Sequence, residues 1–480
     1  MNTSIANRCG RTKIVCTVGP ATQSVDILIK LIKAGMDVAR LNFSHGTYKE
    51  HSGMIRNIRE ASKQTGAPIA ILQDLCGPKI RTGRLQNKFI ELRPGAEIIF
   101  TTDDIIGDEH RISTTYKLLP SDVHEGDTIL LDDGKLRVEA LSTTSNEVRC
   151  RVVFGGRLGE HKGMNLPGVK LSTPSLTEKD IQDLQFGVEN NIDYVALSFV
   201  RSANDIRLLR SYLTKFANYF IPVIAKIEMQ EAIASIDDII AETDGVMVAR
   251  GDLGVEMPAE EVPLLQKMIV RKCNEVGKPV IIATQMLETM IENPRPTRAE
   301  ASDVANAVID GADAVMLSGE TSIGKYPVET VQTMNTIICT TEASILTSKV
   351  SEHGSMNTGD VLDAIAQAAC LLADQVKATA IIPITHSGGT ARRISHFRPI
   401  ANIIAVTGEE RVLRCLNLIW GVQGIVLSDY IGNADAILHR VKEILKEKGY
   451  IKSGDYIVFT MGIPLMARGM TDTINVERVE

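Results

Sequence analysis

The residues best suited to catalysis lie in the stretch 221–256, IPVIAKIEMQEAIASIDDIIAETDGVMVARGDLGVE. Its first apolar run ends in Lys226 and Glu228, and its second apolar run ends in Gly251 and Asp252. Lys226 and Glu228 are two positions apart, so on an extended strand their side chains face the same side. A cation and two carboxylates at the ends of neighbouring strands fit a metal ion and an anionic substrate better than a packed core.

The elements that must position these groups alternate between strand and helix. Strands are predicted at 12–18, 36–42, 68–74, 193–199, 222–228, 245–249, 279–283 and 313–317. Helices are predicted at 24–34, 48–65, 177–190, 203–218, 229–241, 259–276, 298–310 and 327–346. Eight parallel βα units over roughly 250 residues are typical of a closed (β/α)₈ barrel. An open, doubly wound sheet is the alternative, because its parallel strands show the same pattern.

The alternation is interrupted between about residues 83 and 168. The helical period disappears there, and short alternating segments such as AEIIFTT and EVRCRVVF are separated by Gly, Asp and Asn turns. This pattern predicts a small β-barrel domain at 83–168, inserted after the third strand. The barrel domain is therefore predicted in two pieces, 1–82 and 169–346.

A second α/β domain is predicted at 350–480, with a mostly parallel sheet. Its first residues, 351–360, are polar and contain glycine, which is typical of a linker. Strands are predicted at 378–385, 401–407, 422–428, 455–461 and, as an edge strand, 472–479. Helices are predicted at 361–375, 390–397, 409–418 and 432–448. About 130 residues are enough for an independent domain.

Composition excludes several classes of protein. The net charge of −7 is spread over both signs, so we expect no nucleic-acid partner and no membrane association. The N-terminal MNTSIANRCGRTK has no apolar core, so we do not expect a secretory signal. The eight cysteines show no metal-ligand spacing and no close pairs. We therefore expect reduced thiols in a cytoplasmic protein.

Further polar residues follow the other predicted strands, where a barrel of this kind has its active site. Glu228 and Asp252 offer the hard oxygen ligands that Mg²⁺ prefers, with room for water and substrate. Lys226 can neutralise a transferring phosphoryl group or an enolate, and Arg40 and Arg81 suit phosphate oxygens. The other polar residues at this rim are Asn42, Ser44, Asp74, Lys79, Ser198, Arg201, Arg250, Thr284, Gln285, Ser318 and Glu320. Phosphoryl transfer and enolate carbon–carbon chemistry would both use this set.

Several longer motifs follow one another along the chain: KIVCTVGPAT, ARLNFSHG, GPKIRTG, KGMNLPG, AKIE, VMVARGDLGVE, ATQMLETM, PTRAEASDVANAV and MLSGET. In these motifs and in their order, the chain resembles a known family, the pyruvate kinases. The resemblance covers the chain from Lys13 to its end. It is highly specific for residues 13–346 and weaker in the inserted and C-terminal domains. It implies a barrel with an inserted lid, transfer of a phosphoryl group from phosphoenolpyruvate to ADP in glycolysis, Mg²⁺ or Mn²⁺ as cofactor, and a homotetramer.

The resemblance also implies roles for individual residues. It implies catalytic roles for Lys226, Arg40, Thr284 and Ser318, the last two as parts of a proton relay to the enolate. Substrate contacts are implied for Arg40, Lys226, Gly251, Asp252 and Thr284, and Mg²⁺ ligation for Glu228 and Asp252. Nucleotide contacts are implied for Asn42, Phe43, Ser44, His45, Arg81 and Lys162. Lys162 lies in the return hinge of the lid, so lid closure would bring it to the site.

One departure from the family concerns its monovalent-cation site, which Asn42, Ser44, Asp74 and Leu75 match. In K⁺-dependent members the position of Lys79 is a glutamate, and that of Leu75 is polar. An ammonium near the K⁺ position would repel the ion. We therefore expect activity that does not require K⁺. The alternative is that Lys79 points to solvent and K⁺ still binds.

The predicted C-terminal domain carries THSGGTARR at 385–393, a loop that runs from a strand into a helix. Backbone N–H groups and hydroxyls at a helix start can hold an anion. The loop resembles the family's pocket for phosphorylated effectors, which implies effector contacts by Thr385, Ser387, Gly388, Gly389 and Thr390. An ordinary capped strand-to-helix turn is the alternative.

Two other functions share parts of this pattern. One is a Mg²⁺-dependent lyase or aldolase acting on a pyruvate enolate, which would need neither nucleotide contacts nor a lid. The other is a binding protein that senses sugar phosphates, which would need no intact catalytic set.

Overall fold

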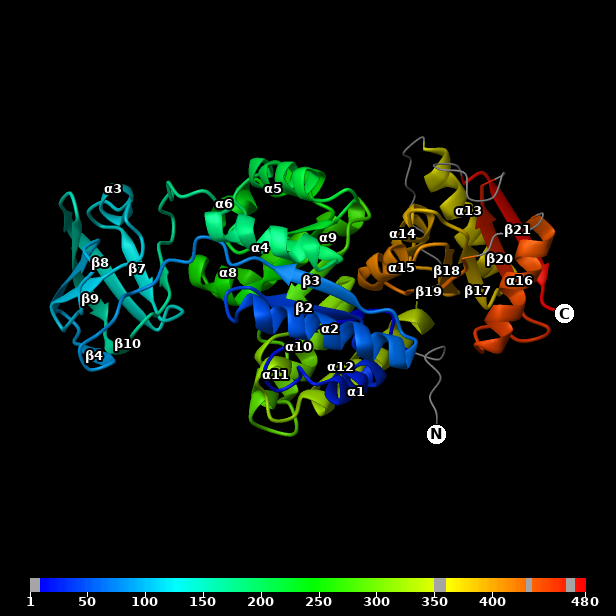
Figure 1. Ribbon diagram of the computed structural model, residues 1–480, viewed down its shortest axis with the longest axis horizontal. Helices are drawn as coiled ribbons and strands as arrows, with labels where there is room; N and C mark the ends of the chain where they lie inside the picture. The colour runs from blue at the N-terminus through cyan, green and yellow to red at the C-terminus, as the bar shows by residue number, and fades with distance from the viewer. Residues whose placement is uncertain (1–8, 349–359, 429–433, 463–470) are drawn as a thin grey trace.

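The computed structural model describes residues 9–348, 360–428, 434–462 and 471–480. The predicted linker, except for its last residue, and the first eight residues lie outside these ranges. Three lobes lie in a row in Figure 1: a β-rich lobe, a central barrel, and a C-terminal α/β lobe. Within the described part of the chain, no helix is long and apolar enough to span a membrane.

The central lobe is a closed barrel of eight parallel strands, in the order β1-β16-β15-β14-β13-β12-β3-β2. Its strands are β1 (Lys13–Thr17), β2 (Val38–Asn42), β3 (Ala70–Asp74), β12 (Tyr194–Leu197), β13 (Val223–Ile227), β14 (Gly245–Ala249), β15 (Val280–Ala283) and β16 (Ala314–Leu317). Almost every strand residue is buried, which explains why the strands read as continuous apolar runs. Closure confirms the predicted barrel and excludes the open sheet.

Helices cover the outside of the barrel (Figure 1). They are α1 (Val25–Ala34), α2 (Tyr48–Thr65), α4 (Glu178–Glu189), α5 (Ala203–Phe216), α6 (Gln230–Ala234), α7 (Ile236–Glu242), α8 (Arg250–Glu256), α9 (Val262–Glu275), η2 (Glu288–Ile291), α10 (Arg298–Asp310), α11 (Gly319–Ser322) and α12 (Pro327–Ser348). The helix predicted at 229–241 is in fact two helices, because Ser235 leaves the helical conformation. The short helices α8 and α11 follow strands directly and were not predicted.

The inserted lobe consists almost entirely of antiparallel strands. A six-stranded sheet has the order β11-β7-β8-β9-β5-β6, and β10 pairs with β4. The elements are β4 (Phe89–Leu92), β5 (Glu97–Thr101), β6 (Arg111–Ser113), α3 (Leu119–Asp122), β7 (Thr128–Leu131), β8 (Leu136–Thr143), β9 (Glu147–Phe154), β10 (Gly156–Gly159) and β11 (Met164–Asn165). Its core is separate from the barrel core, so the insertion can move as a unit.

The C-terminal lobe has a five-stranded sheet in the order β19-β18-β17-β20-β21, in which only β21 is antiparallel. Its strands are β17 (Ala380–Pro383), β18 (Asn402–Thr407), β19 (Val422–Val426), β20 (Tyr456–Met461) and β21 (Thr473–Arg478). Its helices are α13 (Val361–Gln375), α14 (Gly389–His396), α15 (Glu410–Cys415), η3 (Leu416–Leu418) and α16 (Ala434–Glu447). The mostly parallel sheet was predicted, including its edge strand.

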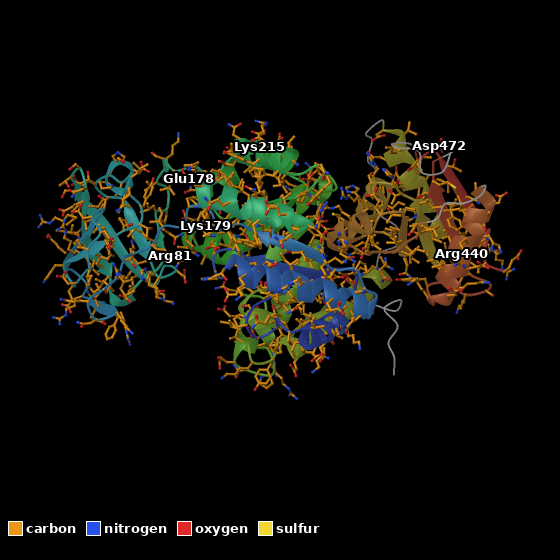
Figure 2. All side chains as sticks on the ribbon, viewed as in Figure 1. Arg81, Glu178, Lys179, Lys215, Arg440 and Asp472 are labelled. Carbon is orange, nitrogen blue, oxygen red and sulfur yellow. A yellow bond between two sulfur atoms is a disulfide. The ribbon has the colours of Figure 1, made fainter. Side chains whose placement is uncertain are left out.

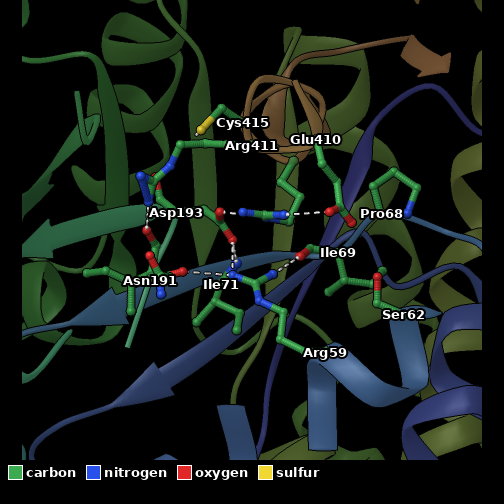
Figure 3. A network of polar contacts seen from close by, with 12 residues as sticks. Arg59, Ser62, Pro68, Ile69, Ile71, Asn191, Asp193, Glu410, Arg411 and Cys415 are labelled. Atoms are coloured by element: carbon green, nitrogen blue, oxygen red, sulfur yellow. Dashed lines mark hydrogen bonds and ion pairs between the residues drawn. The ribbon is translucent and has the colours of Figure 1, made fainter. Parts of the chain in front are cut away.

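A buried carboxylate joins the C-terminal lobe to the barrel (Figure 3). Asp193 lies just before β12 and is 1% exposed. Its Oδ2 accepts hydrogen bonds from Arg59 of α2 at 2.7 Å and from the Ile71 N–H at 2.8 Å. Its Oδ1 accepts from Nε of Arg414 in α15 at 2.8 Å. Asp193 therefore fixes α15 against the end of the barrel opposite to the active site.

The expectation that all eight cysteines are reduced is wrong for two of them. Cys9 and Cys339 form a disulfide, with their Cα atoms 5.5 Å apart. The two residues are 330 positions apart, so no local spacing could indicate the pair. The other cysteines are free thiols. The disulfide joins the chain just before β1 to helix α12.

Candidate active site

The predicted rim residues meet because the barrel strands are in register. Asn42 pairs with Asp74, which in turn pairs with Ala196, so the carboxyl ends of β2, β3 and β12 lie side by side. Lys226 near the end of β13 pairs with Met247 of β14 in the same way. Closure then brings side chains from different strands to one end of the barrel.

Lys226 is the centre of this arrangement and is only 8% exposed. Its Nζ lies 2.7 Å from Oε1 of Glu228 and 3.3 Å from Oδ1 of Asp74. It also donates to the Ser198 hydroxyl at 2.7 Å. A buried ammonium with two carboxylates and one hydroxyl is fixed in position, which suits it to stabilise charge that develops on a substrate.

The charges on Lys226 and Asp74 depend on each other. Burial disfavours the ammonium, but the Asp74 and Glu228 carboxylates outweigh this effect and raise the pKa of Lys226. Burial likewise disfavours the Asp74 carboxylate, but Lys226 and Arg40 hold the pKa of Asp74 below its usual range. Both groups are therefore ionised at neutral pH.

Arg40 is the second fixed cation of the site and is also 8% exposed. Its Nε and Nη2 both lie 2.7 Å from Oδ2 of Asp74, and its Nη1 donates to Thr17 Oγ1 at 2.9 Å. Asp74 therefore bridges Arg40 and Lys226. This arrangement holds two positive groups at a fixed separation, which suits an anionic substrate that contacts both.

Glu228 and Asp252 are the predicted ligands of a divalent cation. Glu228 is 2% exposed and accepts from the Phe199 N–H at 2.8 Å, while Asp252 lies in the first turn of α8. Burial, reinforced by the Asp252 charge and opposed by Lys226, raises the pKa of Glu228. A cation between the two carboxylates would relieve this repulsion.

These two carboxylates suit Mg²⁺ better than a metal ion whose ligands must all come from the protein. Among the described residues, no group of three or more His, Cys, Asp or Glu side chains could hold a metal ion. Two carboxylates leave most of an octahedral shell to water and substrate oxygens, which is how Mg²⁺ is usually held.

Gly251 and Thr284 meet across the ends of β14 and β15. The Gly251 N–H donates to Thr284 Oγ1 at 2.7 Å. Thr284 has φ of 68°, an unusual conformation for a β-branched residue. Arg250 holds it there, because its Nη2 donates to the Thr284 carbonyl at 2.7 Å and its Nη1 to Asp303 at 2.8 Å. Strained backbone of this kind is concentrated at functional sites.

Ser318 follows β16, the neighbour of β15 in the barrel. Its N–H donates to Oε2 of Glu320 at 2.7 Å, and Oε1 of Glu320 accepts from the Leu287 N–H at 3.2 Å. Ser318 therefore lies at the same rim as Thr284, at a turn that Glu320 holds in place. No contact of its hydroxyl with another described residue is observed.

The predicted nucleotide contacts at 42–45 form a tight turn after β2. The Ser44 N–H donates to the Asn42 side chain at 3.1 Å. Phe43 is buried and stacks on the ring of His51 at 4.0 Å between centroids, so its side chain supports the turn. Burial lowers the pKa of His45, and so do the charges of Arg81, Lys79 and Arg40.

Arg81 and Lys162 lie on the two segments that connect the lid to the barrel. Arg81, labelled in Figure 2, donates through Nη1 to the His161 carbonyl at 2.9 Å. Lys162 pairs with Asp132 in the β7–β8 turn at 2.8 Å. The two predicted nucleotide cations therefore lie next to each other, apart from Lys226 and on the lid side.

The residues that match a monovalent-cation site already have partners. The Leu75 carbonyl accepts from the Ser198 hydroxyl at 2.8 Å, and both oxygens of Asp74 face protein cations. Lys79 is exposed, yet its charge contributes to the lowered pKa of His45. Its ammonium therefore adds to the positive potential of the site.

The predicted effector loop begins the helix α14. Thr385 is 5% exposed, and its hydroxyl accepts from the Gly388 N–H at 3.0 Å. Gly388 has φ of 82°, which glycine adopts without strain, and α14 starts at Gly389. Thr390 lies 2.7 Å from the hydroxyl of Thr471. Ser387 is exposed at the tip of the loop.

Sequence reasoning noticed Ser198 and Arg250 without a role, and it missed Thr17, Phe199 and Asp303. Ser198 and Arg250 directly follow apolar runs, and this position could have indicated that they belong to the site. The partners of Arg40, Glu228 and Arg250 come from other strands and helices, and one of them is a backbone N–H, so no local pattern indicates them.

The fold and the site define an enzyme of the (β/α)₈-barrel class, with an inserted lid beside the charged rim. The sequence model "Pyruvate kinase, barrel domain" matches residues 9–331, and "Pyruvate kinase, alpha/beta domain" matches 363–477. The chain belongs to the pyruvate kinase family and is a phosphotransferase.

Similar proteins support this assignment. The chain is 48% identical to the pyruvate kinase of Geobacillus stearothermophilus over 469 residues, which cover 97% of this chain and 80% of the relative. It is 46% identical to the pyruvate kinase of Staphylococcus aureus over 473 residues, 98% of this chain and 80% of the relative. The crystal structure of a pyruvate kinase from Cryptosporidium parvum superposes with a TM-score of 0.90 at 40% identity, covering 98% of this chain and 97% of that one.

Proposed function

We propose that this protein transfers the phosphoryl group of phosphoenolpyruvate to ADP and forms pyruvate and ATP, as in the last step of glycolysis. The observation that carries the proposal is the buried Lys226 ammonium, held between Asp74 and Glu228 at the catalytic end of the barrel. A phosphoryl group that leaves phosphoenolpyruvate places negative charge on both itself and the enolate. A fixed cation there stabilises that charge in the transition state.

Arg40 and Lys226 together would bind the phosphoryl group of phosphoenolpyruvate. Their shared carboxylate, Asp74, sets their separation. The substrate carboxylate would lie at the start of α8, near Gly251 and Thr284, where backbone N–H groups at a helix start favour an anion.

Glu228 and Asp252 would hold Mg²⁺ or Mn²⁺. When bound, the ion neutralises substrate charge and orients the oxygens of the reacting groups. Lys226, whose Nζ lies 2.7 Å from Oε1 of Glu228, would supply a second positive charge beside this carboxylate. The protein contributes rigidity, because Glu228 is fixed by Lys226 and by the Phe199 N–H.

ADP would bind between the rim and the lid. The turn at 42–45 lies on the barrel side, and Arg81 and Lys162 lie side by side on the two segments that connect the lid. Closure of the lid would exclude water, which protects the phosphoryl group from hydrolysis.

The enolate left by phosphoryl transfer must gain a proton at carbon. Thr284 and Ser318 follow neighbouring strands of the barrel, β15 and β16. Their hydroxyls would form part of a proton relay through water.

K⁺ would not be required. The Asp74 oxygens are already paired with Arg40 and Lys226, and the exposed Lys79 adds its charge near His45, next to Ser44 in the chain. The positive charges of Arg40, Lys226 and Lys79 would repel a bound K⁺.

The C-terminal domain would bind a phosphorylated effector at the loop 385–390, through the α14 N-terminus, the exposed Ser387 hydroxyl, and the Thr385 and Thr390 hydroxyls, which now bond to Gly388 and Thr471. We further propose that the protein acts in the cytoplasm as a homotetramer, without a nucleic-acid or membrane partner. Its domains would be 1–82 with 169–346, then 83–168, and 350–480.

One assay tests the central proposal. Pyruvate formation from phosphoenolpyruvate is measured with Mg²⁺, with and without ADP. We expect pyruvate and ATP in equal amounts, and none without ADP. Pyruvate formation that does not depend on ADP would exclude a kinase and favour a lyase or phosphatase.

A further inference from the structure

One of the side-chain contacts between the lid and the barrel joins Asn165 to Glu256. Asn165 ends β11, the last strand of the lid, and its Nδ2 donates to Oε1 of Glu256 at 3.2 Å. Glu256 is the last residue of α8 and is 7% exposed. The bond therefore connects the return hinge directly to the helix that also carries Asp252.

The same helix supports a second part of the lid. A Cβ atom placed on Gly134, in the β7–β8 turn, would lie 3.8 Å from Cγ1 of Val255. This turn also holds Lys162, through the ion pair with Asp132. The turn and the return hinge thus rest on adjacent residues of α8, Val255 and Glu256.

Burial of the Glu256 carboxyl at this position is energetically unfavourable. Its Oε2 is buried without a hydrogen-bond partner among the described residues. The charges that face it are the carboxylates of Glu231 in α6 and Asp252 in α8, and Asn165 is its neutral partner from the lid. An unsatisfied buried carboxylate next to two others destabilises the fold, so structure alone gives no reason for it.

We propose that Glu256 is a positioning residue for phosphoryl transfer, which holds the lid hinge through Asn165 and so sets the place of Lys162 relative to Asp252. The inference rests on the proposed function, because it assigns Lys162 to the nucleotide and Asp252 to the metal. Asp252 and Glu256 are four residues apart on one helix, so they lie on the same face. Any shift of the hinge on Glu256 changes the gap that ADP must fill.

Substitutions at both ends of the bond test this role. Glu256→Ala and Asn165→Ala should each raise the KM for ADP by about tenfold, the order expected from loss of one partly buried hydrogen bond to a carboxyl group. The KM for phosphoenolpyruvate should change by less than about twofold, since its proposed site lies on the barrel alone. Glu256→Gln keeps an acceptor oxygen for Asn165 and should retain a normal KM for ADP.

Two comparisons separate positioning from stability. The double variant should be no worse than either single variant, because both remove the same bond. Glu139→Ala breaks an exposed ion pair with Arg151 inside the lid, which does not touch the barrel, and should leave both KM values unchanged. Three results would each overturn the proposal: an equal rise in KM for both substrates, additive rises in the double variant, or an unchanged KM for ADP. Lack of ADP-dependent activity in the unsubstituted protein would instead reject the proposed function.

Discussion

Nζ of Lys226 and Oε1 of Glu228 lie 2.7 Å apart, two residues from each other at the carboxyl end of the buried strand β13. Residues at the ends of other strands hold this pair in place. Ser198 and Asp74 contact Lys226, and the Phe199 N–H donates to Glu228. Residues from β3, β12 and β13 therefore fix one cation and one carboxylate. Such preorganisation costs stability but needs no rearrangement during the reaction.

Replacement of Lys226 by Met should decrease kcat by at least about 10³-fold while phosphoenolpyruvate binding is largely retained. The methionine keeps the length of the side chain but leaves Asp74 and Glu228 without their shared cation. We also expect a lower free energy of unfolding, by about 3–5 kcal/mol, because two buried carboxylates lose a partner. Steady-state kinetics and urea unfolding measure the two effects.

The control is Lys267→Met, which removes a half-exposed ion pair with Asp310 on the outer surface. It should change the free energy of unfolding by less than about 1 kcal/mol and leave kcat unchanged. A Lys226→Met enzyme with near-normal kcat would refute the role assigned to the ammonium.

The Lys79 ammonium should replace K⁺. Initial rates with K⁺ and with tetramethylammonium as the only monovalent cation should agree within a factor of about two, because no ion is needed beside a fixed charge. In Lys79→Glu the charge is reversed, and K⁺ should then raise the rate by about tenfold or more. Loss of most activity of the unsubstituted protein in tetramethylammonium would show that K⁺ binds despite Lys79.

Glu256 should make stability depend on pH. Burial, with repulsion from Glu231 and Asp252, raises the pKa of its carboxyl to about 7. The folded protein thus binds this proton more tightly than the unfolded chain, whose glutamates titrate near pH ~4.3. The free energy of unfolding should therefore fall as the pH rises from about 4.5 to about 7, by up to roughly 3 kcal/mol from this group.

Glu256→Gln cannot titrate and should lose this component. Urea unfolding between pH ~4.5 and ~8 should give a smaller decrease for the variant than for the unsubstituted protein, so that the variant is the more stable of the two at pH ~8. Glu139→Gln, on the exposed face of the lid, serves as the matched control. Parallel curves for Glu256→Gln and the unsubstituted protein would contradict the expected titration.

The barrel and most of its rim could be predicted because they depend on local pattern. Buried parallel strands read as apolar runs, and their polar end residues, such as Lys226 and Asp252, stand out against them. The contacts between distant segments could not be predicted. Asn165 and Glu256 are 91 positions apart, and neither has a neighbour in the sequence that indicates the other. Ser198 was visible at a strand end, but its bond to Lys226 exists only because the barrel closes.

The Cys9–Cys339 disulfide should stabilise the protein, and it is the feature in which the sequence expectation failed outright. Cross-linking residues 330 positions apart restricts the unfolded chain over most of the barrel. Reduction, or Cys339→Ser, should lower the free energy of unfolding by about 2–4 kcal/mol.

Cys9 also lies two residues before Arg11, whose guanidinium donates to the carbonyls of Pro399 and Ile400 in the C-terminal domain. Loss of the disulfide should therefore loosen this contact as well.

Alkylation of the denatured protein without reductant should modify six thiols, and all eight after reduction. Cys76→Ser, at a free and partly buried thiol, is the control for the substitution itself. Eight reactive thiols before reduction would show that the disulfide does not form.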